Sequence, residues 1–258
     1  MKRVRSLLLS TAVRDCRRSQ LVALAQNLGR PISGVPAATK RGSPGPRDIY
    51  PGRVGLWNDQ VFPRVMDRVL RTPEVNARRA EVCQGLHGRV LEIGFGTGLN
   101  LRHYPSEVTE ILVVEPSKSA MRLAEPRKAA VPASVEHVGI DGARLDLPDG
   151  SVDCVLSTYT LCTIPDGNAA LREIHRVLKP DGALHFLEHG RAPTESVRRW
   201  QHRLHPVHSR IAGGCHLDRP IDEMITHAGF LIRQLETGYG DGPRPFSYLY
   251  RGRALPSG

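Results

Sequence analysis

The chain has 258 residues, of which 40% are hydrophobic, enough for one α/β domain with additions and a sizeable core. Its formal net charge of +10 would favour a polyanionic partner if the charge were spread over the fold. Residues 1–47, however, hold ten lysines and arginines against one acidic residue, and the remainder carries a net charge of only +1. The charge therefore belongs to the N-terminal segment, and a nucleic-acid partner is not expected for the rest.

The N-terminal segment, residues 1–47, is predicted to be a disordered basic extension, and residues 48–258 to form the folded domain. The extension ends in a run rich in glycine and proline, which cannot bury enough apolar surface to order itself. No run approaches the 18 to 20 apolar residues of a membrane span. The five cysteines are odd in number and contain no C-x-x-C pair, so neither a disulfide framework nor a metal site is indicated. A cytoplasmic protein is expected.

Helices are predicted over residues 55–86, where apolar residues recur at three- and four-residue steps. After them strands and helices alternate, which predicts parallel strands joined by crossover helices. A second helical segment covers residues 194–216, and with 55–86 it is expected to form a lid. The predicted strands are 89–93, 111–115, 135–140, 151–157, 183–188, 230–235 and 246–251, with further helices over 117–128, 167–178 and 221–227 and a turn at 179–182.

The first predicted strand runs into Gly94-Phe95-Gly96-Thr97-Gly98. Glycines between a strand and a helix let the backbone turn sharply and approach a ligand without a side-chain clash. The dinucleotide pattern G-x-G-x-x-G/A fails here because its last position is Leu99. The loop therefore predicts a bound ligand other than a dinucleotide.

Carboxylates stand at the carboxyl ends of three successive predicted strands, at Glu92, Glu115 and Asp141. Glu115 could accept hydrogen bonds from both hydroxyls of a ribose, and Asp141 could accept from the exocyclic amine of adenine. Glu92 could lie near an amino group of the ligand or orient the loop. One such carboxylate alone is more often a solvated strand end. Three at the edge where open α/β sheets bind ligands favour a ligand site.

Four segments in order resemble the successive motifs of class I S-adenosylmethionine-dependent methyltransferases of the type 11 group: residues 90–100, 114–117, 147–153 and 176–182. The resemblance spans about residues 88–190. It implies an α/β, Rossmann-like, seven-stranded and mainly parallel sheet of order 3-2-1-4-5-7-6 with helices on both faces. It also implies S-adenosyl-L-methionine as the cofactor. The cofactor residues that carry over are Glu92, Gly94, Gly96, Gly98, Glu115 and Asp141, with Met121 packing near adenine.

The sequence indicates the methyl acceptor less clearly than the cofactor. Residues 157–165 lack the Asn/Asp-Pro-Pro-Tyr/Phe signature of methylation on nucleic-acid bases. Leu161-Cys162, Glu188-His189, Trp200-Gln201 and the stretch from Gly214 to Arg219 resemble the alkyl-thiol methyltransferases and their bacterial relatives. The resemblance implies a small-molecule acceptor, a hydrophobic thiol or another small S- or O-nucleophile.

Two catalytic candidates follow the fourth and fifth predicted strands. His189 could act as a general base, because imidazole titrates near neutral pH, or it could be a structural histidine bonded to backbone. Tyr159 is expected to border the transferring methyl group. Cys215-His216 with His205 and His208 match no zinc template, so no metal is expected. The alternatives are a quinone- or phospholipid-type methyltransferase, an RNA methyltransferase anchored by the basic extension, and a nucleotide-binding oxidoreductase.

Overall fold

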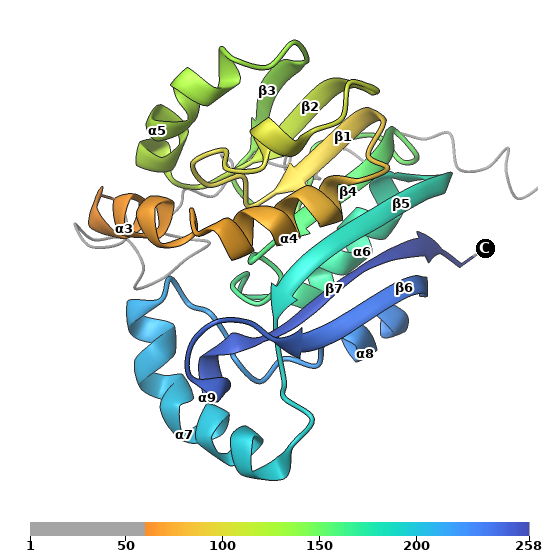
Figure 1. Ribbon diagram of the computed structural model, residues 1–258. Helices are drawn as coiled ribbons and strands as arrows, with labels where there is room; N and C mark the ends of the chain where they lie inside the picture. Colours follow the sequence, from red (N-terminus) through yellow and green to blue (C-terminus); the bar gives the residue numbers. More distant parts are fainter. Residues whose placement is uncertain (1–59, 258) are drawn as a thin grey trace, which may run out of the picture. The chain divides into compact units, whose positions relative to one another are not determined.

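One seven-stranded sheet organises residues 60–257, the part of the chain that the computed structural model describes (Figure 1). The strand order is β3-β2-β1-β4-β5-β7-β6. The first five strands pair in parallel, and β7 pairs antiparallel with both β5 and β6. The predicted fold class and strand order are therefore confirmed. The strands are β1 Gly88–Ile93, β2 Val108–Val114, β3 Ser134–Gly139, β4 Val152–Thr158, β5 Leu178–His189, β6 Phe230–Tyr239 and β7 Tyr248–Pro256.

Helices cover both faces of the sheet. In Figure 1, α4 crosses in front of the strands while α6 and α8 lie behind them. Two buried apolar clusters correspond to these layers, one including residues of α6 and α8 and the other residues of α4 and α5. None of the helices described here is long and apolar enough to cross a membrane. The helices are α3 Phe62–Val69, α4 Pro73–Cys83, η2 Leu101–His103, α5 Lys118–Lys128, α6 Gly167–Val177, α7 Glu195–Ile211, α8 Ile221–His227 and α9 Arg244–Ser247.

Polar side chains fix where three of the helices begin. The hydroxyl of Thr72 accepts the Val75 N–H at 3.2 Å ahead of α4, and Ser117 caps α5 in the same way. The carboxylate of Asp166 caps α6, accepting the Ala169 N–H at 2.9 Å. Each cap satisfies a backbone donor that the first turn leaves unpaired, so the loops that precede α4, α5 and α6 have defined ends.

β6 and β7 run to Tyr239 and Pro256, past the predicted ends at 235 and 251. The type of element also differs from the prediction at two places. The turn predicted at 179–182 lies within β5 as a bulge. Val152 of β4 pairs with Leu178, and the next pair is Cys154 with Ala183, so residues 179–182 have no strand-pairing partner on β4. The prediction of a strand from Phe246 is wrong by two residues, since Phe246 belongs to α9. The proline-rich sequence after Gly242 forms that short helix before β7 begins at Tyr248. Neither difference alters the strand order.

The predictions for residues 1–47 and for the start of the first lid segment lie outside the described residues. Within the described part, the two lid segments contain α3, α4 and α7. The parallel strands β1, β2, β4 and β5 all end at one edge of the sheet, at Ile93, Val114, Thr158 and His189. The loops that leave these strand ends therefore meet in one place.

Candidate functional site

A cavity of about 620 Å³ lies at the carboxyl ends of the parallel strands. Its volume falls within the range of small-molecule sites, and its position is the crevice where open α/β sheets bind ligands. Part of its wall is the glycine loop and the end of β2, and another part is apolar. The apolar wall includes Phe62, Met66 and Leu70 from the α3 segment and Phe246 and Leu249 from the C-terminal segment.

The glycine loop is locked to Glu115. The N–H of Gly96 donates to Oε2 of Glu115 at 2.7 Å, and the N–H of Ser117 donates to Oε1 at 2.7 Å. Burial raises the pKa of Glu115 above its usual range even though both oxygens accept backbone hydrogen bonds. This carboxylate lines the cavity beside Gly94 and Gly96, as expected for a ligand-binding strand end.

Gly94 and Gly96 both have left-handed φ values, 73° and 58°, but different surroundings. A Cβ at Gly94 would lie 2.0 Å from the hydroxyl of Thr160, so packing alone demands glycine there. Among the described residues 60–257, a Cβ at Gly96 would meet no atom closer than 3.9 Å. The space beside Gly96 is therefore open to a ligand.

Glu92 does not line the cavity. Its carboxylate is fully buried behind the loop, where it accepts from Nδ2 of Asn100 at 2.8 Å and from the hydroxyl of Tyr104 at 2.7 Å. Burial raises the pKa of Glu92 to about 7. Of the two roles considered for it, this position favours orienting the loop over touching the ligand.

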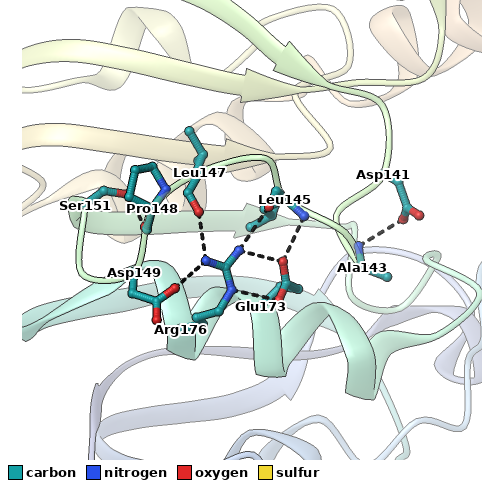
Figure 2. A network of polar contacts seen from close by, with 9 residues as sticks. All are labelled: Asp141, Ala143, Leu145, Leu147, Pro148, Asp149, Ser151, Glu173 and Arg176. Atoms are coloured by element: carbon teal, nitrogen blue, oxygen red, sulfur yellow. Dashed lines mark hydrogen bonds and ion pairs between the residues drawn. The ribbon is translucent and has the colours of Figure 1, made fainter. Parts of the chain in front are cut away.

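Three other residues expected at the cofactor are also absent from the cavity wall. Gly98 packs among Leu101, Phe95 and Ala124, and Met121 packs against the apolar cluster of α4 and α5. The carboxylate of Asp141 accepts the N–H of Ala143 at 2.9 Å and so closes its own turn (Figure 2). The neighbours of Asp141, Ile140 and Gly142, do line the cavity.

The loop that carries Asp141 toward β4 is fixed to α6 by Arg176 (Figure 2). The guanidinium donates to the carbonyls of Leu147 and Leu145 at 2.8 and 3.0 Å and pairs with Asp149 at 2.6 Å. The carboxylate of Glu173 accepts from both Arg176 and the Leu145 N–H. This network is structural, because none of its side chains lines the cavity.

Sequence reasoning missed Arg79, a buried cation on α4 that lines the cavity. Its Nη1 donates to Oδ1 of Asn100 at 2.6 Å and to the hydroxyl of Thr158 at 3.0 Å. Its Nε has no hydrogen-bond partner, and burial lowers its pKa. Within residues 60–257 no carboxylate forms an ion pair with it. A signal was present, since Arg79 stands four residues after Val75 and three before Val82, on the buried stripe of a helix.

Tyr159 and His189 lie together on the cavity wall, with ring centroids 5.0 Å apart, and the guanidinium of Arg79 lies over the Tyr159 ring at 5.4 Å. Tyr159 has φ 56°, a strained conformation for a bulky residue, and its N–H donates to the Leu187 carbonyl at 2.8 Å. Burial raises the pKa of Tyr159 to about 12, so its hydroxyl is neutral and can donate a hydrogen bond. The Nδ1 atom of His189 lies 3.9 Å from the Cys215 sulfur.

The side chain of Glu188 fixes the position of the loop after β4. Its buried carboxylate accepts from the hydroxyl of Ser157 at 2.7 Å and from the N–H groups of Thr160 and Cys162 at 3.1 and 3.2 Å. In the sequence, Glu188 was notable only as part of the resemblance to the alkyl-thiol methyltransferases. The structure gives it a positioning role for the loop that carries Tyr159.

The α3 helix is joined to the glycine loop through Asp67. Its carboxylate accepts from the hydroxyl of Thr97 at 2.6 Å and pairs with Arg127 of α5 at 2.9 Å. Arg127 also donates to the Thr97 carbonyl at 2.5 Å. The apolar wall contributed by α3 is thus connected to the part of the site expected to bind the cofactor.

The antiparallel β7 beside β5, the glycine loop after β1 and the buried carboxylate after β2 together define a Rossmann-like methyltransferase. A family model described as a methyltransferase domain matches residues 91–186. The human thiol S-methyltransferase TMT1B is 33% identical over 217 residues, covering 76% of this chain and 85% of that protein. The chain belongs to the family of S-adenosylmethionine-dependent methyltransferases that includes this human protein.

Other comparisons agree with this assignment. The rat thiol S-methyltransferase TMT1B is 34% identical over 166 residues, which cover 62% of this chain and 65% of that protein. The Escherichia coli ubiquinone/menaquinone biosynthesis C-methyltransferase UbiE is 29% identical over 113 residues, 41% of this chain and 45% of that protein.

Solved structures share the fold. A SAM-dependent methyltransferase from Aquifex aeolicus has a TM-score of 0.53 at 15% identity, covering 75% of this chain and 97% of that one. The [4+2]-cyclase SpnF has a TM-score of 0.56 at 20% identity, covering 72% and 81%. Because a cyclase also has this fold, the likeness to solved structures shows the fold alone.

Proposed function

We propose that this protein transfers the methyl group of S-adenosylmethionine to the sulfur of a small apolar thiol. One observation carries the proposal: a single cavity joins the glycine loop and Glu115 to an apolar wall that ends at His189 and Tyr159. The first part suits an adenosyl cofactor and the second a hydrophobic acceptor. The names of the mammalian relatives, thiol S-methyltransferases, support the choice of acceptor. The reducing cytoplasm, which keeps thiols free, is the proposed location.

The donors and acceptors around the glycine loop fit the cofactor. Each oxygen of Glu115 accepts one backbone N–H and retains a second lone pair, so the carboxylate can also accept from the two ribose hydroxyls. The open space at Gly96 allows close approach of the ligand. Ile140 and Gly142 supply apolar wall for adenine, next to Asp141.

Arg79 is the proposed partner of the methionine carboxylate of the cofactor. Within residues 60–257, Arg79 hydrogen-bonds to the neutral groups of Asn100 and Thr158 and lies over the Tyr159 ring. A buried cation with such partners is costly unless an anion joins it. The cofactor brings one carboxylate, and Arg79 lines the cavity in which it would lie. The buried Nε, which has no hydrogen-bond partner within residues 60–257, adds to the cost of leaving this cation without an anion.

Two ligands separate this role from a general effect on folding. Arg79→Met should weaken binding of S-adenosylhomocysteine by roughly tenfold or more, the size expected for a lost charged hydrogen bond. It should leave binding of methylthioadenosine, which lacks the carboxylate, nearly unchanged. Arg198→Met is the matched control, because Arg198 is paired with Glu195 and does not line the cavity. Equal losses for both ligands in calorimetric titration contradict the assignment of Arg79.

The reaction needs a thiolate. The acceptor sulfur attacks the methyl carbon in line, the new S–CH₃ bond forms as the sulfonium S–CH₃ bond breaks, and S-adenosylhomocysteine leaves with the bond electrons. An ordinary thiol has a pKa of about 8.5 and is mostly protonated at pH 7, so the site must favour loss of its proton. His189 lies on the cavity wall where such activation is required, and Tyr159 beside it can hold the sulfur in place.

A matched pair of acceptors tests the proposal. Octanethiol and octanol have the same chain and differ in the nucleophilic atom. With the cofactor present, the full chain should form methyl octyl sulfide and S-adenosylhomocysteine in equal amounts, and no methyl octyl ether, as measured by mass spectrometry. Methylation of phenols or quinols in place of thiols overturns the choice of acceptor.

A further inference from the structure

Three side chains from separate segments meet in the wall of the cavity. Cys162 follows β4, His189 ends β5, and Cys215 follows α7. The two sulfur atoms are 3.7 Å apart, the Cys215 sulfur is 3.9 Å from Nδ1 of His189, and all three potential ligand atoms lie within 4.8 Å of one another. Both cysteines are free and buried. No sequence spacing indicates this cluster, because its members are far apart along the chain.

The distances suit a tetrahedral metal ion. Zinc bound to thiolates at about 2.3 Å places two sulfur ligands about 3.8 Å apart, and a sulfur and an imidazole nitrogen about 3.6 Å apart. The sulfur–sulfur separation of 3.7 Å already matches the edge of such a tetrahedron. The imidazole nitrogen, 3.9 Å from the Cys215 sulfur and within 4.8 Å of the Cys162 sulfur, would have to move closer to both when an ion binds. Thiolate and imidazole together are ligands that favour zinc over the harder divalent cations.

The backbone holds the cluster in place without a metal. The N–H of His216 donates to the Cys162 carbonyl at 2.7 Å, which ties the two cysteine-bearing segments together. The N–H of Cys162 donates to Glu188, and His189 is fixed by the pairing of β5 with Leu249 of β7. Ligands held by rigid supports lose little entropy when an ion binds.

We propose that Cys162, His189 and Cys215 bind one zinc-class divalent cation, with a fourth coordination position open to the acceptor cavity. All three residues line that cavity, so an ion held among them faces it. Three protein ligands with one open position are the arrangement of catalytic zinc sites, whereas structural sites are closed by four. Two thiolates also balance the charge of the ion in a buried position.

The open position is where the acceptor thiol binds, a step that rests on the proposed function. Coordination to the cation removes the thiol proton, which passes to water, and leaves a bound thiolate. The thiolate sulfur then forms the new bond to the methyl carbon while the sulfonium bond of the cofactor breaks. In this arrangement His189 is a ligand of the cation and not a general base.

Metal content tests the site without reference to turnover. The reduced full chain is incubated with zinc chloride, excess metal is removed by gel filtration, and zinc per chain is measured by mass spectrometry. The expected result is about one zinc per chain, lost in Cys162→Ser and in Cys215→Ser. Cys83→Ser is the matched control, because Cys83 is a buried free thiol outside the cluster.

Cobalt substitution keeps the test decisive if a variant folds poorly, because it reads the unmodified chain. Cobalt at this site should show a thiolate-to-metal charge-transfer band and the intense visible bands of tetrahedral coordination. Cobalt held instead by His205, His216 and Asp218 would give no thiolate band. Failure of the reduced chain to retain zinc, or retention unchanged in both serine variants, overturns the proposal.

The acceptor step and the proposed function can fail separately. Adding octanethiol to the cobalt form should shift the visible bands, and octanol should not. If zinc binds but no thiol is methylated, the choice of acceptor is wrong and the metal site stands. If metal-free protein methylates octanethiol at the full rate, the role of the open position is wrong.

Discussion

Gly96 and Gly150 offer a direct test of where the cofactor lies. Both have a left-handed φ of 58°, and a Cβ at either would meet no close neighbour in the described part of the chain. Gly96 lines the cavity at the carboxyl end of the sheet, whereas Gly150 lies in the turn before β4, at the opposite end of that strand. Replacing each by alanine therefore applies the same backbone perturbation at two places, only one of which faces the proposed ligand.

The two substitutions should cost the same stability. An L-residue in the left-handed region costs about 1–2 kcal/mol, which lowers the Tm of a domain of this size by about 2–4 °C for each kcal/mol. Only Gly96→Ala also adds a methyl group to space that the cofactor fills. Overpacking of that kind costs about 1–3 kcal/mol, so the Kd for S-adenosylmethionine should rise roughly 5- to 150-fold.

Thermal unfolding and calorimetric titration measure the two effects separately. The expected pattern is equal losses of Tm in both variants, with weakened cofactor binding in Gly96→Ala alone. Cofactor affinity unchanged in Gly96→Ala would mean that the ligand does not pass the glycine loop at this point. Equal weakening in Gly150→Ala would mean that the loss arises from general destabilisation, and the reasoning from cavity geometry would fail.

Three further predictions concern carboxylates. Glu115→Gln should weaken S-adenosylmethionine binding at least tenfold in titration, because an amide cannot accept both backbone N–H groups and the ribose hydroxyls. The control is Glu110→Gln on the preceding strand β2, which should bind the cofactor normally. Folding raises the pKa of Glu92 from 4.5 to about 7, so the folded chain binds a proton between these pH values that the unfolded chain does not. The free energy of unfolding of the wild type should therefore fall as pH rises from 4.5 to about 7, by on the order of 3 kcal/mol. Denaturant unfolding of Glu92→Gln should show no such fall. If the variant's free energy of unfolding depends on pH as the wild type's does, the raised pKa does not belong to Glu92. Asp67→Ala should raise the KM for the acceptor several-fold by freeing α3 from the glycine loop, while Asp149→Ala, which removes an exposed ion pair, should leave the KM unchanged.

Much of the fold can be predicted from local patterns in the sequence. The buried strands 89–93 and 151–157 stand out as short apolar runs, and alternation with helices specifies a parallel sheet. The misplaced boundaries have a different cause. The bulge at 179–182 and the short helix at Phe246 depend on how β5 and β7 pair with distant strands, which no local pattern contains.

The site divides in the same way. The glycine loop and Glu115 were predictable because each directly follows a strand, and parallel strands end at one edge. Asp141 was placed by the same reasoning, yet its side chain bonds to its own turn. The sequence places Arg79 on the buried stripe of its helix, but only helix docking brings it to the cavity. The cluster of Cys162 with Cys215 was not predictable, because loop closure brings these two residues together.

The residues after β4 connect the two halves of the cavity. Thr158, the last residue of β4, accepts from Arg79, and Thr160 packs against Gly94. The Tyr159 ring lies 5.4 Å from the Arg79 guanidinium and 5.0 Å from the centroid of the His189 ring. The segment is hydrogen-bonded to β5, from the Tyr159 N–H to the Leu187 carbonyl and from the Thr160 N–H to Glu188. We therefore expect an ion or acceptor that moves His189 to shift this segment. Because coupling between two binding sites is reciprocal, the bound cofactor should alter the affinity for the thiol by the same factor that the thiol alters affinity for the cofactor.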